Sequence, residues 1–360
     1  MDAVITGLAT ANPPLVVSQE DTLAFLEQNV ALDADTAAFY ARLLRDGHIR
    51  QRNFGMQDLG DALETDPDRL LARFLRFARS TALDAARRAL DGSGLAPDQV
   101  RGLVVNTCTG YLCPGLSAYI AEDLGLAESV RHQDLMGMGC GAALPNLAAA
   151  AGMLATGVDG PVLCVAVEIC SATICLGPER ELVVSNSIFG DGAAAAVVET
   201  PAAAGARALL ALCDFGSGLF PRYREDLRYR HANGRLRNRL SPRVPVIGAR
   251  SARTVATAVL ERQGLQLTDV DHWVVHPGGT VVLERAQRSL GLEREDLDSA
   301  YAVFRDHGNM SSPSVLFVLR HLLDTHAPPA GARGMLLAFG AGFSAFALFV
   351  RFAGADQVGS

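Results

Sequence analysis

The sequence of 360 residues contains no lysine, so all 32 of its basic side chains are arginine. Without lysine the chain has no amine for a Schiff base, a pyridoxal phosphate anchor or a Walker-type phosphate loop. It also lacks a Cys-x-x-Cys pair and any cysteine and histidine cluster with ligand spacing, which argues against a metal centre such as zinc. These absences exclude several classes of cofactor enzyme.

Long apolar runs and export signals are missing as well. No stretch reaches the ~20 apolar residues that span a bilayer, and the first residues carry no basic segment typical of a secretory signal. Seven cysteines, an odd number, are typical of a reducing compartment. A net charge of -7 disfavours a broad surface for nucleic acid. We therefore expect a cytoplasmic protein with no nucleic acid partner and no membrane insertion.

Short apolar runs alternate with segments of helical period, which predicts a layered α/β fold. Asp66 and Pro67 are a start signal for the first long helix, as its N-cap and its first helical residue. Strands are expected at residues 102–106, 162–167, 193–199, 273–276, 334–338 and 345–352. Helices are expected at residues 67–91, 117–124, 144–156, 249–263, 281–290 and 314–325.

Three segments recur in the same order at nearly constant spacing, which predicts an internal duplication. The pairs are LVVN at 103–106 with WVVH at 273–276, GCGAA at 139–143 with GNMSS at 308–312, and FGDGAAAAVV at 189–198 with FGAGFSAFAL at 339–348. The chain would then divide into an N-terminal half, 1–213, and a C-terminal half, 214–360. The first half carries extra residues at 166–187, an insertion expected to serve a pocket or a subunit contact.

The loops after equivalent strands of two such halves can converge on one crevice, because open α/β sheets bind ligands beyond the carboxyl ends of their strands. Cys140, His276 and Asn309 all lie in such loops. The glycines beside Cys140 leave room for an incoming thioester, and a following helix N-terminus favours its thiolate. Taken singly, a small core cysteine, a turn histidine and a helix N-cap asparagine remain alternatives.

Together WVVHPGG, GNMSS with the following VLF, the Cys140 segment and FGDGAAAAV resemble the motifs of bacterial type III polyketide synthases, the chalcone synthase-like enzymes. The resemblance covers most of the chain, from about Ile49 to Phe352. It implies an α/β, thiolase-like fold of two duplicated halves in αβαβα layers. The N-terminal half would carry the nucleophilic cysteine and the C-terminal half the histidine and asparagine, in a homodimer.

The resemblance further implies an iterative decarboxylative Claisen condensation of malonyl-CoA onto an acyl-CoA starter held as a thioester on Cys140. Cyclisation would then give a resorcinol, pyrone or phloroglucinol product. His276 would pair with the Cys140 thiolate, and His276 and Asn309 would donate hydrogen bonds to the thioester oxygen. Phe189 matches the aromatic residue that shapes the pocket mouth and excludes water. No cofactor is implied beyond the coenzyme A thioester substrates.

Further residues match the substrate pocket of the family: Cys108, Thr109, Cys113, Thr173, Asn238 and Ser311. Cys113 is expected to reach the partner subunit, Thr173 to influence chain length and Ser311 to lie behind the nucleophile. Asn238 stands where the family has a second aromatic gate residue, and Ala341 replaces a proline of the C-terminal loop. The rim of the pocket therefore departs from the family pattern, and loop packing is the alternative role for these residues.

The basic residues that bind coenzyme A phosphates are only partly matched. Arg42 stands at one such position, whereas the acidic Asp46 stands at another. We expect Arg45, Arg50 and Arg52 to compensate, because arginine binds phosphate bidentately. A solvated charged helix face is the alternative for this segment.

Two other functions fit part of the pattern. A single-round condensing enzyme similar to ketoacyl-carrier-protein synthase III would use the same three residue types, with the arginine-rich segment 235–243 as a docking patch for a carrier protein. A non-catalytic subunit that binds acyl-CoA is the other, and the presence of Cys140, His276 and Asn309 argues against it. The starter, the number of extensions and the ring closure depend on cavity shape.

Overall fold

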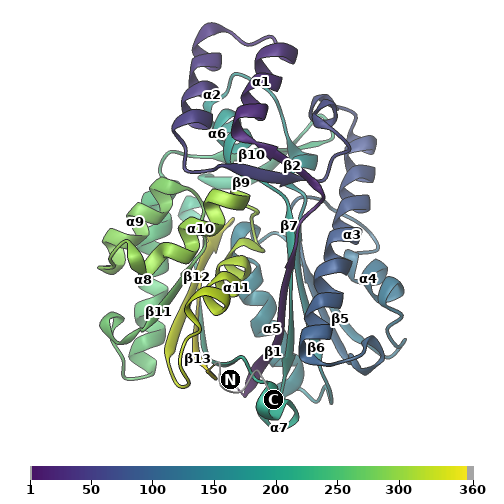
Figure 1. Ribbon diagram of the computed structural model, residues 1–360, viewed down its shortest axis with the longest axis vertical. Coiled ribbons are helices and arrows are strands. Elements are labelled where there is room, and N and C mark those ends of the chain that lie inside the picture. The colour runs from purple at the N-terminus through teal and green to yellow at the C-terminus, as the bar shows by residue number, and fades with distance from the viewer. Residues whose placement is uncertain (1, 355–360) are drawn as a thin grey trace.

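The computed structural model describes residues 2–354 and contains a large central sheet flanked by helices (Figure 1). The strands in this range are β1 (Ala3–Ala11), β2 (Leu15–Ser18), β3 (Gln51–Phe54), β4 (Gly102–Asn106), β5 (Arg131–Leu135), β6 (Val162–Glu168), β7 (Gly192–Glu199), β8 (Leu210–Leu219), β9 (Leu227–Ala232), β10 (Arg235–Leu240), β11 (His272–Val275), β12 (Arg333–Gly340) and β13 (Ser344–Phe352). The α-helices are α1 (Gln19–Asn29), α2 (Ala34–Asp46), α3 (Pro67–Ser93), α4 (Leu116–Leu124), α5 (Ala143–Ala155), α6 (Arg180–Ile188), α7 (Pro201–Ala204), α8 (Val244–Arg262), α9 (Thr280–Leu290), α10 (Asp298–His307) and α11 (Ser314–His326).

The main sheet has the strand order β11-β12-β13-β8-β1-β7-β6-β4-β5, and its two sides repeat one topology. Outward from β1 lie β7, β6 and β4, joined by two antiparallel pairings and one parallel pairing. Outward from β8 lie β13, β12 and β11, joined in the same way. This repeat confirms the predicted duplication, with β8 as the first strand of the second copy.

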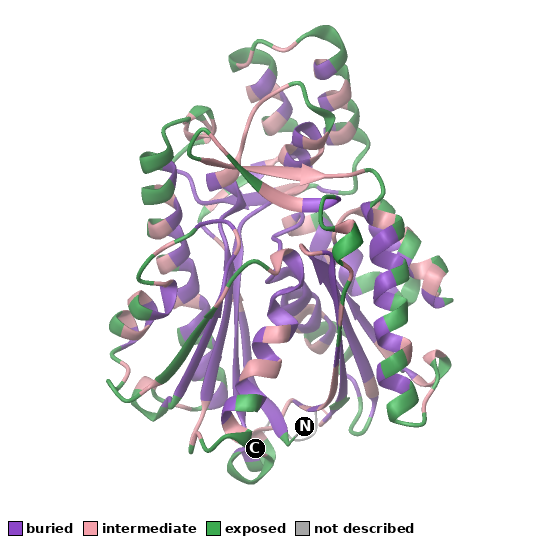
Figure 2. Ribbon diagram, turned by 180° about the vertical axis from the view of Figure 1, so that it is seen from behind, coloured by how far each residue is buried: buried purple, intermediate pink, exposed green. Residues whose placement is uncertain are grey.

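The two halves of the main sheet, which meet where β1 pairs with β8, form two strand layers. Helices form three further layers, one outside each half and one between them. Helix α3 packs on the outer face of β1, β6 and β7, and α8 packs on the outer face of β8, β12 and β13. Between them α5 contacts β4, β6, β7 and β13, while α11 contacts β1, β7, β11 and β12, so both helices touch strands of both halves. Figure 2 shows these inner helices and strands as mostly buried. The α/β, thiolase-like αβαβα prediction is therefore confirmed.

The three recurring sequence pairs occupy equivalent places in the two copies. Asn106 ends β4 and His276 directly follows β11. Cys140 precedes α5 and Asn309 precedes α11, while both Phe-Gly turns lead into the antiparallel strands β7 and β13. The domain boundary expected between residues 213 and 214 falls inside β8. Residues 355–360 of the expected C-terminal half lie outside the described residues.

Local signals predicted most long elements well. Helix α3 begins at Pro67, and the Asp66 side chain accepts hydrogen bonds from the backbone N–H groups of Asp68 and Arg69, as an N-cap does. The insertion was placed too early, because residues 166–168 complete strand β6. The extra segment instead forms the short 3-10 helix η4 (Cys170–Thr173) and helix α6.

The sequence-based prediction missed β1, β8 and α10, and also several elements that cover the carboxyl ends of the parallel strands. Helices α1, α2 and α6 and the β9–β10 hairpin lie together at one end of the main sheet, at the top of Figure 1. The hairpin turns at Asn233 and Gly234, both with positive φ, the conformation that a two-residue turn between twisted strands requires. This group of elements forms a lid over the loops that carry Cys140, His276 and Asn309.

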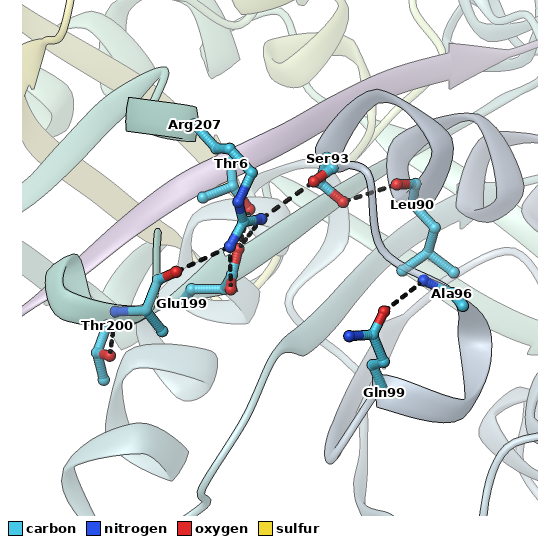
Figure 3. Close-up of polar contacts among 9 residues, drawn as sticks. Thr6, Leu90, Ser93, Ala96, Gln99, Glu199, Thr200 and Arg207 are labelled. Carbon is cyan, nitrogen blue, oxygen red and sulfur yellow. Dashed lines mark hydrogen bonds and ion pairs between the residues drawn. The ribbon is translucent and has the colours of Figure 1, made fainter. Parts of the chain in front are cut away.

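An ion pair between the buried Glu199 and the partly exposed Arg207 ties the opposite end of the N-terminal half together (Figure 3). Glu199, at the end of β7, accepts hydrogen bonds from Arg207 Nη1 at 2.8 Å and Nη2 at 2.9 Å, and from Thr6 Oγ1 at 2.6 Å. Arg207 also donates to the carbonyl oxygens of Ser93 and Ala203, at 3.0 and 2.9 Å. The pair therefore joins β1, β7 and the end of α3. Within residues 2–354, no helix has both the length and the apolar character needed to cross a membrane.

Candidate active site

One cavity of about 710 Å³ brings together the side chains that the motifs singled out. Cys140, His276 and Asn309 line it with Phe189, at the carboxyl ends of the inner strands and beneath the lid. Cys140 comes from the N-terminal half, whereas His276 and Asn309 come from the C-terminal half. Their exposed fractions are only 9%, 1% and 3%, so all three are buried in the wall of the cavity.

Close packing between the two halves explains why glycines stand beside Cys140. Cys140 lies in the short 3-10 helix η3 (Gly139–Gly141), which packs directly on the turn after β12. A Cβ on Gly139 would lie 2.8 Å from the backbone nitrogen of Ala341, and one on Gly141 would lie 2.7 Å from Phe346. These glycines therefore allow the two halves to approach each other. Clearance for a thioester stays a prediction.

Burial opposes charge on both Cys140 and His276. Desolvation raises the pKa of the Cys140 thiol to about 12, an effect that the Ser311 hydrogen bond reduces and the nearby Glu168 carboxylate strengthens. Desolvation also lowers the pKa of His276 to about 3. Each group alone is therefore neutral near pH 7, and a thiolate–imidazolium pair requires that each charge stabilise the other.

Hydrogen bonds fix the orientation of the Asn309 amide. The Ser311 backbone N–H donates to Asn309 Oδ1 at 2.8 Å, so the oxygen of the amide is already occupied. Asn309 Nδ2 donates to the carbonyl oxygen of Gly278 at 3.3 Å, in the turn that follows His276. A planar NH₂ group has a second N–H, and this donor remains for a ligand in the cavity.

Ser311 connects the nucleophile to a second thiol. Its hydroxyl donates to Cys140 Sγ at 3.3 Å and lies 3.5 Å from Cys108 Sγ. Ser311 has a φ of 59°, a left-handed conformation that costs a non-glycine residue about 1–3 kcal/mol. The hydroxyl lies behind the nucleophile, as the motif comparison anticipated for this position, and the strained backbone places it there.

Glu168 is a site residue that the sequence did not reveal. It is fully buried at the end of β6, where Oε2 accepts hydrogen bonds from the backbone N–H groups of Cys108 and Thr109, at 2.9 and 3.1 Å. Oε1 accepts a hydrogen bond from Ser312 Oγ at 2.7 Å. The carboxylate thus joins the loop after β4 to the loop before α11. The only sequence signal was a lone acid at the end of the apolar run VLCVAVE.

The expected pocket residues are distributed over several environments. Thr173 and Asn238 line a second cavity of only about 20 Å³, and Phe189 belongs to the walls of both cavities. Thr109 is buried, with its hydroxyl donating to Glu168 and accepting from the backbone of Ile169, so it does not line either space. Cys113 is exposed at the surface.

Comparison with known proteins accounts for this arrangement. Residues 10–215 match the model of the family described as FAE1/Type III polyketide synthase-like protein, and residues 219–353 match that of chalcone and stilbene synthases, C-terminal domain. The chain belongs to the type III polyketide synthase family. The members of this family are acyltransferases that condense malonyl-CoA units and need no further cofactor.

Two relatives and one solved structure illustrate the likeness. The 3,5-dihydroxyphenylacetyl-CoA synthase of Streptomyces toyocaensis is 35% identical over 283 residues, which cover 76% of this chain and 71% of that protein. The alpha-pyrone synthesis polyketide synthase-like Pks18 of Mycobacterium tuberculosis is 30% identical over 355 residues, which cover 94% and 88%. The structure of 1,3,6,8-tetrahydroxynaphthalene synthase from Streptomyces coelicolor A3(2) superposes with a TM-score of 0.88 at 25% identity, covering 98% of this chain and 100% of that one.

The arginines expected to bind coenzyme A occupy three different environments in this type III polyketide synthase. Arg42 lines the cavity, whereas Arg45 is exposed on the same helix, α2, away from the cavity wall. Arg52 is fully buried, and its guanidinium donates to the Gln19 side chain and to backbone carbonyls. A substrate phosphate cannot reach it, so the expectation for Arg52 is wrong. Arg50 is exposed and pairs with Asp306 at 3.4 Å.

A second cavity arginine was missed. Arg180, the first residue of α6, lines the same wall as Arg42, and the two guanidinium carbons lie 4.8 and 5.1 Å from the ring centre of Phe39. Among the described residues neither guanidinium has a carboxylate within 4.0 Å. Glu179 also lines this wall but pairs with Arg237 at 2.8 Å. The segment GPERE mixes charges of both signs, so no pattern in the sequence pointed to Arg180.

Proposed function

We propose that this enzyme carries out iterative decarboxylative condensation of malonyl-CoA onto an acyl-CoA starter bound to Cys140. The observation that carries the proposal is the shared cavity, in which a thiol, an imidazole and a carboxamide face one largely apolar space. Cys140 attacks the thioester carbonyl of the starter while His276 takes the thiol proton. The coenzyme A thiolate leaves, and the acyl group remains on Cys140.

Asn309 and His276 then act on malonyl-CoA. The bond to the terminal carboxylate breaks, carbon dioxide leaves, and the electron pair remains as an enolate of the thioester. The free N–H of Asn309 and an N–H of His276 stabilise that enolate oxygen, a contribution commonly worth about 10²–10³ in rate for one donor. The enolate carbon attacks the acyl group on Cys140 and releases the thiolate. Reloading of the extended chain onto Cys140 starts the next cycle.

The mouth of the cavity supports binding of coenzyme A by Arg42 and Arg180. Two guanidinium groups without carboxylate partners converge on Phe39, an arrangement that an anionic group would stabilise. The diphosphate or ribose phosphate of coenzyme A provides that anion. Glu181 lines the same wall and disfavours phosphate, so the two arginines must outweigh its charge.

The shapes of the two cavities support an aliphatic starter. Leu227, Leu240, Val244 and Phe304 give the larger cavity apolar walls, whereas the smaller cavity holds about one water molecule. We propose that the growing chain occupies the larger cavity beside the starter. The product would be a resorcinol, pyrone or phloroglucinol released after cyclisation.

We further propose a cytoplasmic homodimer that pairs through the exposed edge of the main sheet. Strand β5 ends the sheet, and residues 131–134 are all exposed. Unpaired strand edges are usually covered, and Tyr111 and Met136, exposed by 67% and 38%, extend this edge with apolar surface. Residues 136–138 connect β5 to η3, so a second copy would support the segment that precedes Cys140 and would approach Cys113.

The proposal is tested by incubating the purified protein with malonyl-CoA and a panel of acyl-CoA starters, followed by mass spectrometry. We expect products with several malonyl-derived units from the wild type and none from Cys140→Ala. For Asn309→Ala we expect malonyl-CoA decarboxylation to fall by about 10²–10³ while the acyl group still loads onto Cys140. Turnover by Cys140→Ala would overturn the nucleophile assignment. A product with a single added unit would favour a ketoacyl synthase III-like reaction.

A further inference from the structure

Arg52 is the largest side chain that the structure buries completely among the described residues. Its Nε donates to Gln19 Oε1 at 3.0 Å, and its Nη1 donates to the carbonyl oxygens of Asn186 and Phe189, at 2.7 and 2.8 Å. No carboxylate of the described residues lies within 4.0 Å of it. A buried arginine normally has an anionic partner, so its hydrogen-bond acceptors need an explanation.

The two carbonyl acceptors belong to the C-terminal end of helix α6. A helix leaves its last carbonyl groups without intrahelical partners and carries partial negative charge there. Arg52 binds the carbonyls of Asn186 and Phe189, and Gln19 Nε2 donates to the carbonyl of Ser187 at 3.0 Å. The remaining carbonyl, of Ile188, accepts the backbone N–H of Asn309 at 2.8 Å. Arg52 and Gln19 therefore cap the same helix end that holds Asn309.

The segments of Phe189 and Asn309 are joined further by their backbones. Gly190 N–H donates to the Asn309 carbonyl at 3.0 Å, which completes a parallel bridge between Phe189 and Asn309. Arg52 packs beneath this bridge, because a Cβ on Gly308 would lie 3.0 Å from the Arg52 stem. A change in the position of Arg52 would therefore move the Phe189 and Asn309 segments together.

We propose that Arg52 and Gln19 form a buried clamp that positions both Phe189 and Asn309 for decarboxylation of malonyl-CoA. Arg52 is a positioning residue in this proposal, since its guanidinium faces the helix end and not the cavity. The inference rests on the proposed function, because it assigns to the clamp the placement of the Asn309 donor. It predicts that the clamp affects decarboxylation more than acyl loading, which needs Cys140 and His276 alone.

Arg52→Met tests the clamp, because methionine keeps an unbranched apolar stem and removes every hydrogen bond of the guanidinium. Two reactions are followed separately: acyl loading onto Cys140 by intact mass, and conversion of malonyl-CoA to acetyl-CoA by chromatography. We expect decarboxylation to fall by about tenfold to a hundredfold, as displacements of about 1 Å commonly cause, with acyl loading unchanged. Arg52→Lys keeps the charge and one or two donors, and should recover part of the decarboxylation rate.

Two further variants keep the proposal falsifiable if Arg52→Met folds poorly. Gln19→Leu removes the bonds to Ser187 and Arg52 and should show a smaller selective loss of decarboxylation. Arg207→Met is the matched control, since it removes an arginine that binds backbone carbonyls and Glu199 at the opposite end of the molecule (Figure 3). It should lower the melting temperature and leave the ratio of decarboxylation to loading at the wild-type value.

The outcomes separate this inference from the proposed function. Equal losses of loading and decarboxylation in Arg52→Met, or full decarboxylation by a folded Arg52→Met, would overturn the clamp. Absence of both reactions in the wild type would instead overturn the proposed function.

Discussion

Cys140 and His276 are the two residues whose ionisation decides how the reaction starts. Burial raises the pKa of the thiol to about 12 and lowers that of the imidazole to about 3, so neither group is charged on its own near pH 7. Proton transfer from one to the other creates two opposite charges in the same cavity. The reactivity of the thiol should therefore depend strongly on His276.

Alkylation of Cys140 by iodoacetamide tests this dependence. In His276→Gln the thiol retains the pKa of about 12 that burial imposes, and only the thiolate reacts. Its alkylation rate should therefore rise about tenfold per pH unit from pH 7 to beyond pH 10, because each unit below a pKa reduces the thiolate tenfold. In the wild type the imidazole accepts the proton, so the rate should level off at lower pH.

The pH profile is measured by mass spectrometry of the peptide that contains Cys140, because the exposed Cys113 also reacts. His48→Gln is the control. The exposed His48, which follows the end of α2, lines the same cavity and should leave the wild-type profile unchanged. Superimposable profiles for the wild type and His276→Gln would show that His276 does not take the thiol proton.

At the scale of single residues, the sequence identified the reacting groups better than the residues that position them. Cys140, His276 and Asn309 could be located because each lies in a motif at an equivalent position of a duplicated unit. Arg52 was misassigned because a charge in the sequence carries no information about burial. Two of its acceptors are the carbonyl groups of Asn186 and Phe189, more than a hundred positions away, and such partners are known only once the chain has folded.

Among the elements, those with strong local signals were predicted closely. Helix α3 has a cap, a proline and a long apolar face, and β4 is a short run of buried residues. Strand β5, with the sequence RHQDL, is polar and exposed and becomes a strand only by pairing with β4. Helix α6 has nine residues, and its end is capped by Arg52 and Gln19 from distant segments. The Asn-Gly turn of the β9–β10 hairpin was a usable signal that the sequence-based prediction overlooked.

Helices α2 and α6 together form the wall that we propose for coenzyme A. Replacing both Arg42 and Arg180 by methionine removes two phosphate donors and leaves Cys140, His276 and Asn309 unchanged. We expect KM for malonyl-CoA to rise by at least about tenfold, because hydrogen bonds to charged groups are stronger than neutral ones. The catalytic constant at saturation should stay close to that of the wild type, since neither side chain contacts the reacting atoms.

Steady-state kinetics at two salt concentrations measure this effect, with Arg45→Met as the control. Arg45 is exposed on the same helix and does not line the cavity, so its removal should change KM little. A truncated substrate, malonyl-N-acetylcysteamine, lacks the phosphates and should show the same KM in the wild type and in the double variant. An unchanged KM for malonyl-CoA would refute phosphate binding by this wall.

For the whole molecule, the duplication explains why so much of the architecture followed from three short repeats. Two copies of one topology place both α5 and α11 between the two halves of the sheet, where each helix contacts strands of both copies. A thiol from one copy and a carboxamide from the other then meet without any signal in the intervening sequence. Cavity volumes did not follow, because the division into about 710 and 20 Å³ depends on the packing of α2, α6 and the hairpin.

The exposed edge of β5 leads us to predict how the protein assembles. If a second copy covers this edge, the wild type should have twice the mass of one chain by light scattering. Placing aspartate at both Tyr111 and Met136 puts charges on the apolar surface beside the edge and should give a monomer. That monomer should also lose condensation, because residues 136–138 lead directly into η3 and Cys140. Leu71→Asp, at an exposed apolar position on α3, should remain a dimer with full activity. A monomeric wild type with full activity would exclude a role of this edge in assembly. It would also show that the segment before Cys140 needs no contact with a second copy.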